Sequence, residues 1–271
     1  MKKFCSILLK TALILCVLGV LFLGIGFATG GTTVAKDGIH LSLSKVHWDL
    51  LDYLPSLKGN WGIKQEVLKD GQDELVLQRD DLKSIDIDAP AVHLVMKTDL
   101  SADTITFSCE SNKEKKRLGF TFDRYSDDGI VKIRPKHKYS HLSLSKAPTV
   151  TITLPEMYTL ENLNLDLANC SVKMDGILHI KNCDVDIAAG NFKTKKVEFK
   201  NLRIDNAAGN VDMALWGKEE DYNFNIDCAI GQLCVGEHSE NGFANEYQSG
   251  SGANTIDVDT AAGNVKISFL K

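Results

Sequence analysis

Apolar and polar residues alternate with a period of two through most of the second half of the chain, which is typical of β-strands that bury one face. Three of these stretches share an Ala-Ala-Gly-Asn motif followed by an apolar residue, at Ala188–Phe192, Ala207–Val211 and Ala261–Val265. An aspartate stands four residues before each glycine. Because glycine and asparagine tolerate positive φ, the motif predicts a sharp corner between two strands.

The same frame recurs around Cys170, around Gly231 and, more loosely, around Pro90. From Cys170 onward, the corner positions follow one another at steps of 20, 19, 22 and 32 residues. A unit of about twenty residues cannot bury its apolar side alone, so successive units are expected to stack. The sequence therefore predicts an all-β fold, a single-stranded β-solenoid or β-helix-like stack of about twenty-residue coils. Its predicted structural corners are Gly190, Gly209, Gly231 and Gly263.

Shorter alternating stretches, separated by turn signals, extend the strand pattern towards the N-terminus. The predicted strands are Leu75–Leu77, Ile85–Ile87, Val92–Met96, Ile105–Cys109, Phe120–Phe122, Ile130–Ile133 and Val150–Leu154. Residues 75–271 are therefore expected to form one extracytoplasmic solenoid domain. Within it, residues 240–254 contain a Ser-Gly-Ser-Gly run and are expected to be a flexible loop.

The N-terminal residues have the pattern of a membrane anchor. Thr11–Ala28 carries no charge and is long enough as a helix to span most of a bilayer. Lys2, Lys3 and Lys10 favour a cytoplasmic N-terminus. We expect residues 1–30 to form a transmembrane helix that anchors the chain in the cell membrane, and a cleaved signal peptide is the competing interpretation.

Residues 31–74 are expected to be a connector. Ser44 precedes a stretch with apolar residues on one side, which Pro55 ends. The expected helix over residues 44–54 either caps the open end of the solenoid or lies on the membrane interface.

Composition and charge exclude some functions. The formal net charge is −5, and beyond the three lysines of the anchor there are 28 basic against 36 acidic residues. This balance argues against nucleic acid as a partner. The seven cysteines form no CxxC pair and no zinc-finger spacing. Those beyond the anchor are expected to be small buried hydrophobic residues, and a disulfide between coils remains open.

The aspartates of the repeat are the most prominent candidates for chemistry. If coils stack about 4.8 Å apart, each adjacent pair repels by about 0.9 kcal/mol in water and about 3.5 kcal/mol at an effective dielectric of about 20. A solvated face is therefore expected, and a row for divalent cations or basic partners is the alternative. The aspartates in this frame are Asp86, Asp166, Asp186, Asp205, Asp227 and Asp259.

No motif indicates catalysis. The sequence contains no HExxH, GxSxG or P-loop motif, so we expect no catalytic, cofactor-binding or metal site and infer that the chain is not an enzyme. One basic cluster is a candidate contact for anionic lipid headgroups or wall polymers, with an ordinary exposed hairpin tip as the alternative. Its residues are Arg134, Lys136, His137, Lys138 and His141.

The chain resembles the bacterial putative-adhesin family of unknown function, which includes the LiaG-like proteins. The resemblance rests on Ser84–Asp88, on Val150–Pro155 and on the corners at Gly190, Gly209 and Gly263. The family usually has Ser/Thr-Gly-Asp at the corner where this chain has Ala-Gly-Asn. The resemblance implies a membrane-anchored β-solenoid outside the membrane and a role in adhesion or envelope stress, without catalytic residues.

Two functional hypotheses follow. In the first, the chain is a non-catalytic, membrane-anchored protein of the bacterial envelope that acts as an adhesin or surface-binding module. In the second, it is an accessory envelope-stress or regulatory protein that acts through a membrane partner. The expected partners are a wall polymer, lipid headgroups or another envelope protein.

Overall fold

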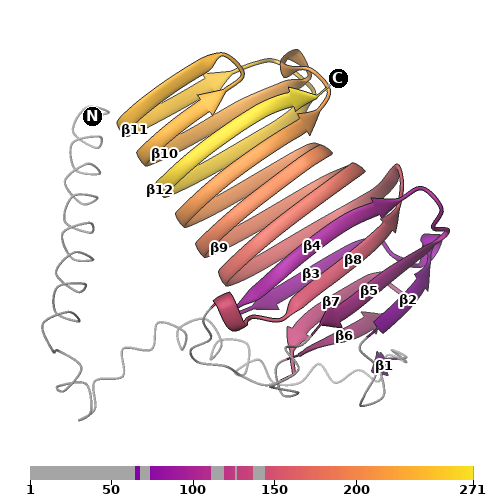
Figure 1. Ribbon diagram of the computed structural model, residues 1–271. Coiled ribbons are helices and arrows are strands. Elements are labelled where there is room, and N and C mark those ends of the chain that lie inside the picture. The colour runs from indigo at the N-terminus through magenta and orange to yellow at the C-terminus, as the bar shows by residue number, and fades with distance from the viewer. Residues whose placement is uncertain (1–64, 68–73, 111–118, 126, 137–143, 271) are drawn as a thin grey trace, which may run out of the picture. The chain divides into compact units, whose positions relative to one another are not determined.

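The computed structural model shows one stack of β-strands (Figure 1). The residues it describes are 65–67, 74–110, 119–125, 127–136 and 144–270. Across these ranges there are strands and short 3-10 turns but no α-helix. None of the described residues forms a helix long and apolar enough to cross a membrane, and the predicted anchor and connector helix lie outside them.

The strands are β1 (Gln65–Val67), β2 (Glu74–Gln78), β3 (Ser84–Ala89), β4 (Val92–Asp99), β5 (Thr104–Glu110), β6 (Phe120–Tyr125), β7 (Ile130–Pro135), β8 (Thr149–Pro155), β9 (Tyr158–Trp216), β10 (Tyr222–Val235), β11 (His238–Ser249) and β12 (Asn254–Leu270). The 3-10 turns are η2 (Arg79–Asp81), η3 (Leu144–Lys146) and η4 (Glu219–Asp221).

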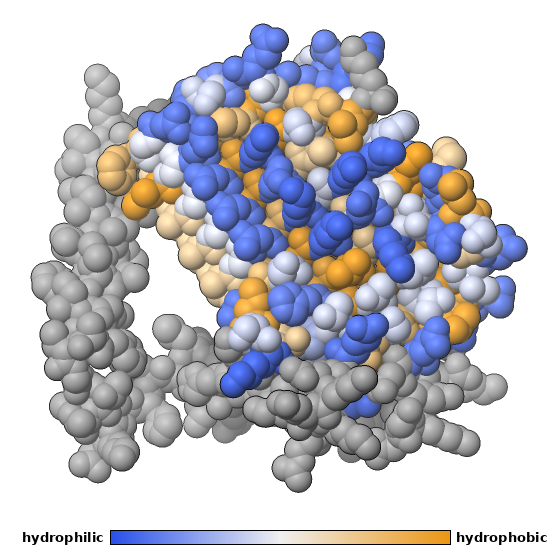
Figure 2. All heavy atoms as spheres, viewed as in Figure 1, coloured by the Kyte–Doolittle hydropathy of each residue, from blue (hydrophilic) through white to orange (hydrophobic). Residues whose placement is uncertain are grey.

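The centre of the molecule is β9, a 59-residue strand segment that winds around the core as successive coils. Side chains one coil apart lie side by side. Asn182 donates a hydrogen bond to Asn162, 20 residues away, and Asn201 donates one to Asn182, 19 residues away, both at 3.0 Å. On the face seen in Figure 2, hydrophilic side chains accordingly form rows that run across the stacked coils. The predicted solenoid of about twenty-residue coils is confirmed.

Each coil points alternate side chains inward, where they stack on equivalent residues of the neighbouring coils. One such row consists of Leu165, Val185, Ile204, Val258 and Ile226, each no more than 2% exposed. Burying a side chain of this size stabilises the fold by about 1.5–3 kcal/mol. Because adjacent coils share these rows, the apolar face that a single coil cannot bury becomes one continuous core.

The structure describes five cysteines, of which four are buried and Cys234 is half-buried. Cys170, Cys183, Cys228 and Cys234 carry free thiols. Burial raises the pKa of the Cys170 thiol to about 12, so this side chain behaves as a small neutral core residue. The buried four are Cys109, Cys170, Cys183 and Cys228.

Towards its N-terminal end the stack divides into two short sheets. β3 and β4 pair in parallel with the first part of β9 and together make the first coil. Beyond that coil, β7, β6 and β1 continue the sheet from β3, and β8, β5 and β2 continue it from β4. The ring centroids of Phe107 and Phe122 lie 6.0 Å apart in the core between the two sheets. All seven predicted strands are present, as β2 to β8.

At the C-terminal end the coils do not stack in chain order. β12 lies between the last coil of β9 and β10 and is parallel to both, with Asp259 beside Asp205 on one side and Asp227 on the other (Figure 1). The expectation that successive units stack in sequence is therefore wrong here. All three coils carry the same inward and outward pattern, so either order buries the same kind of rows.

β11 is a strand and not the flexible loop expected over residues 240–254. It pairs antiparallel with β10, with Gly242 opposite Gly231, and is the last strand at this end of the stack. Its inward positions are polar, so the alternation of its side chains is invisible in a hydropathy pattern.

Candidate functional site

The aspartates of the repeat form one column on the outer side of the coils, on the wall that precedes the glycine corner. Neighbouring members come from different strands or coils and are held side by side by the register of the sheet, which is parallel except between β10 and β11. We name this row the acidic column. In stacking order its members are Asp88, Asp166, Asp186, Asp205, Asp259, Asp227 and Glu246.

The structure corrects the first member of this column and adds a last one. Asp88 is paired with Asp166, whereas Asp86, which the sequence frame assigned to the column, is paired with Asn164. Asp86 and Asp88 are separated by one apolar residue, so either could occupy the aspartate position of the repeat. The pairing of β3 with β9 shows that Asp88 occupies it. Glu246 joins the column because β11 is a strand.

A second column runs beside the first, two residues earlier in each parallel strand and two residues later in the antiparallel strand β11. Its hydrogen bonds join neighbouring coils: Asn164 donates to Asp86 at 2.7 Å, and Asn225 donates to Asp257 at 2.9 Å. The two columns together, which we name the acidic face, hold ten carboxylates and one arginine. The second column consists of Asp86, Asn164, Asp184, Arg203, Asp257, Asn225 and Gln248.

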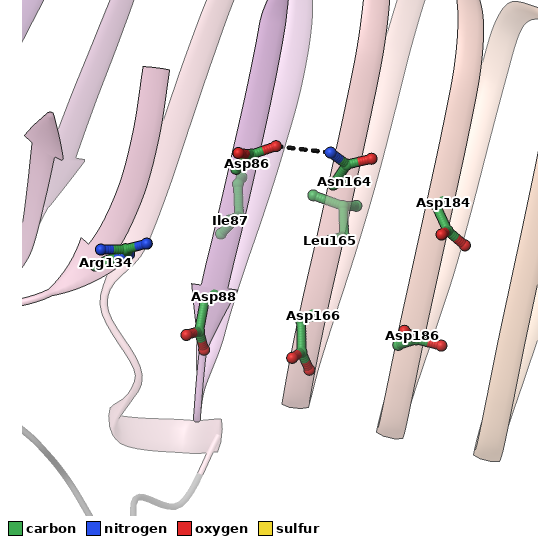
Figure 3. Close-up of a pocket in the computed structure, with 9 residues that line it drawn as sticks. All are labelled: Asp86, Ile87, Asp88, Arg134, Asn164, Leu165, Asp166, Asp184 and Asp186. Atoms are coloured by element: carbon green, nitrogen blue, oxygen red, sulfur yellow. Dashed lines mark hydrogen bonds between the residues drawn. The ribbon is translucent and has the colours of Figure 1, made fainter. Parts of the chain in front are cut away.

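At the β3 end of the acidic face the two columns line a shallow, open pocket with a volume of about 220 Å³ (Figure 3). Arg134 from β7 projects towards the carboxylates from one side. Five carboxylates thus share this pocket with a single guanidinium group. The lining residues are Asp86, Ile87, Asp88, Arg134, Asn164, Leu165, Asp166, Asp184 and Asp186.

Four carboxyl groups of the acidic column have a raised pKa, and in each the largest cause is partial burial, followed by repulsion from a neighbouring carboxylate. Arg134 partly lowers the pKa of Asp88 again. Arg203, whose Nη2 lies 2.6 Å from Asp205, has the same effect on the pKa of two others. The column therefore keeps negative charge that its surroundings only partly neutralise. The four groups are Asp88, Asp186, Asp227 and Asp259.

On the other side of the glycine corner, another row of outward-facing positions on these coils is occupied by neutral asparagines. Asn210 donates a hydrogen bond to Asn191 at 2.9 Å, and Asn264 donates one to Asn210 at 2.9 Å. Stacked asparagines therefore satisfy one another from coil to coil without repulsion. Coil stacking does not require carboxylates at outward positions, so the acidic column is a particular property of this face.

The acidic column presents its carboxylates one per coil, about 4.8 Å apart. Among the residues that the structure describes, no group of three or more His, Cys, Asp or Glu is placed to hold a metal ion. Chelation of calcium needs six to eight oxygen ligands around one point. The negative charges of the acidic column are instead spaced evenly along the stack.

The raised pKa values predict that the acidic column weakens folding as the pH rises. A group with a raised pKa contributes most to stability below its ordinary pKa, here 3.8, and loses that contribution as the pH rises through its folded-state value. We define the column variant as the chain with Asp186→Asn, Asp227→Asn and Asp259→Asn. In urea unfolding of the full chain in detergent, the variant should gain stability relative to the wild type between about pH 4 and pH 7. A relative loss over that range would show that the carboxylates are favourably paired.

The four predicted corner glycines lie in a row beside the acidic column. All have positive φ, with values of 158°, 138°, 144° and 149° for Gly190, Gly209, Gly231 and Gly263. They also touch one another, because a Cβ added to Gly209 would lie 1.6 Å from the carbonyl oxygen of Gly190. These positions are structural and present no side chain to a partner.

The structure describes two residues of the predicted basic cluster, Arg134 and Lys136. Arg134 lines the acidic pocket, and the backbone N–H of Lys136 donates to the carbonyl oxygen of Gly119 at 2.8 Å. His137, Lys138 and His141 lie outside the described residues. Of these two residues, Arg134 therefore borders the acidic face.

Comparisons with known proteins agree with this architecture. Residues 82–215 match the family model Toastrack DUF4097. A solved structure of a putative cell adhesion protein from Clostridium sporogenes is 17% identical, with a TM-score of 0.51, over 73% of this chain and 99% of that chain. The match and this neighbour confirm the resemblance to the putative-adhesin family, and at this identity the neighbour supports the fold alone.

More distant solved structures are also similar to the chain. A putative adhesin from Bacteroides fragilis is 8% identical, with a TM-score of 0.24, over 72% of this chain and 95% of that chain. A putative lipid binding protein from Parabacteroides distasonis is 12% identical, with a TM-score of 0.23, over 74% of this chain and 98% of that chain. No curated protein matches the chain.

Proposed function

We propose that the chain is a non-catalytic surface-binding module of the bacterial envelope, with the acidic face as its contact surface, in keeping with the match of residues 82–215 to the Toastrack DUF4097 family model. The lysine-flanked apolar segment at residues 1–30 would hold it in the cell membrane, with the solenoid on the outer side. A cell adhesion role, which the name of the Clostridium sporogenes neighbour carries, is compatible with such a module.

The observation that carries this proposal is the acidic column itself. Its members lie about one strand spacing apart, and each adjacent pair of unit charges at that distance repels by about 0.9 kcal/mol in water. The asparagines at Asn191, Asn210 and Asn264 show that the fold accepts a neutral, hydrogen-bonded column instead. A row that costs stability and that the fold does not need is best explained by binding.

The chemistry of the acidic face defines the partner. Ten carboxylates against Arg203 within the face, with Lys132 and Arg134 on the adjoining strand β7, leave a strongly negative surface. Positive charges repeated along an extended chain could pair with successive coils. Exposed ion pairs each contribute about 0.2–1 kcal/mol, so affinity would come from several of them acting together. The partner class is therefore a polymer or a protein segment of the envelope that carries amino groups along its length.

The proposal predicts that the full chain, purified in a non-ionic detergent, binds a fluorescent peptide of about ten lysines. The column variant should bind about tenfold more weakly, because three of the exposed ion pairs are lost. The affinity should fall as salt is raised, since salt screens the attraction between exposed charges. Fluorescence anisotropy measures each of these quantities.

A charge-matched variant provides the control for this experiment. Asp103→Asn, Asp127→Asn and Asp128→Asn remove the same three charges from exposed positions outside the acidic column. This control should bind within about twofold of the wild type, because only long-range attraction is lost. If both variants lose the same affinity, or if the wild type does not bind, the acidic face is not a contact surface.

A further inference from the structure

The strand β11 (His238–Ser249) leaves one edge of the sheet open. It is 12 residues long and lies at one end of the stack (Figure 1). Among the described strands it pairs with β10 alone, while β10 pairs on both sides, with β11 and β12. The outer edge of β11 therefore presents backbone N–H and C=O groups that are ready to pair with another strand.

The side chains of β11 that face the core differ from those of every coil beneath it. Pairing with β10 places them over Ile226, Cys228, Leu233 and Val235, which are all buried. Yet they are polar and contact one another: His238 lies 3.2 Å from Glu240, and its ring stacks on Tyr247 at 4.7 Å. The inward residues of β11 are His238, Glu240, Asn245, Tyr247 and Ser249.

The outer edge of β11 lacks several of the common devices that block strand pairing. The strand contains no lysine, arginine or proline. The one such device that the strand does contain is an inward carboxylate, Glu240, whose Oε1 lies 3.2 Å from Nε2 of His238. Phe243, near the middle of the strand, is 80% exposed. A long edge with few such devices and an exposed aromatic side chain is the pattern of an interface.

We propose that this edge binds β11 of a second copy of the chain, antiparallel, in a two-fold symmetric dimer. The two β11 strands can pair in several registers. Only a register in which inward-facing residues lie opposite inward-facing residues joins the interiors of the two copies across the interface. With Gly242 opposite Phe243 of the second copy, the corners of the two strands also coincide. The facing pairs are then Asn245 with Glu240, Tyr247 with His238, and Ser239 with Glu246.

These pairs are complementary. An amide faces a carboxylate, an aromatic ring faces an imidazole, and neither Glu240 nor Glu246 faces a like charge. The two Phe243 side chains come together near the two-fold axis, where pairing would cover much of their exposed surface. The dimer is an isologous interface, in which the same patch serves both copies. It goes beyond the proposed function and does not depend on it.

The test is sedimentation velocity of the full chain in detergent over about a hundredfold range of concentration. The wild type should shift from monomer to dimer. Ser239→Glu places a like charge opposite Glu246 twice across the axis and should weaken the dimer about tenfold. Ser239→Lys places an opposite charge there and should strengthen it. Phe243→Ser should also weaken it.

Thr255→Glu is the control, because it adds the same charge to an exposed position on β12 between two paired strands. It should leave the dimer unchanged. A wild type that stays monomeric throughout would overturn the proposal and favour a segment of the same chain as the cover of this edge. A dimer that Ser239→Glu, Ser239→Lys and Phe243→Ser all leave unchanged would also overturn it, since it would form elsewhere.

Discussion

Gly209→Ala should abolish the folded solenoid or lower its thermal midpoint by many degrees. Gly209 has a φ of 138°, which side-chain-bearing residues rarely adopt. An added Cβ would lie 1.6 Å from the carbonyl oxygen of Gly190 in the next coil, and that atom is backbone. The coils would have to separate at this corner, which would break the stacked rows on both sides. Thermal circular dichroism of the full chain in detergent measures the loss.

Substitution of Gly242, which pairs with the corner residue Gly231, is a control that distinguishes the steric clash from the backbone strain. Gly242 has a φ of 120°, but an added Cβ there would meet nothing within 4 Å. Gly242→Ala should therefore cost only the strain, on the order of 1–3 kcal/mol. Equal losses from the two substitutions would mean that the coils are not in contact at Gly209, which would contradict the stacked corner.

The sequence predicted the features that depend on a local pattern. Alternation placed the strands β2 to β8, and the repeated glycine with positive φ placed the corners. Both follow from steric rules that act within a few residues. The outward aspartates were equally visible, because a period of two assigns each residue to one face.

Features that depend on which coils are neighbours could not be predicted in the same way. The order of β9, β12 and β10 is hidden because each coil offers the same pattern to its neighbours. Asp88 and Asp86 fit the repeat equally well until pairing with Asp166 selects one. β11 was not predicted as a strand because its inward positions include Glu240 and Tyr247, whereas the hydropathy pattern of a buried strand has apolar residues there. The first two failures concern tertiary pairing, and the third arises because pairing with β10 makes a strand of a segment whose local pattern does not predict one.

The central claim is that the acidic column is kept for binding at a cost to folding, and the stability of the column variant tests it most directly. Each of its three asparagines removes repulsion from both neighbours in the column. An asparagine can also bond to the next coil, as Asn210 does to Asn191. After allowance for solvent screening, the gain should be about 1–3 kcal/mol, which raises the midpoint of a chain of this size by roughly 2–10 °C.

The measurement is the thermal midpoint of the full-length wild type and of the column variant, in the same detergent at about pH 7, with oligolysine binding measured on the same samples. The account predicts opposite signs: a higher midpoint and weaker binding in the variant. A midpoint that falls in the variant would show that the carboxylates support the fold. If oligolysine binding were also unchanged in the column variant, the acidic column would not be a binding surface either.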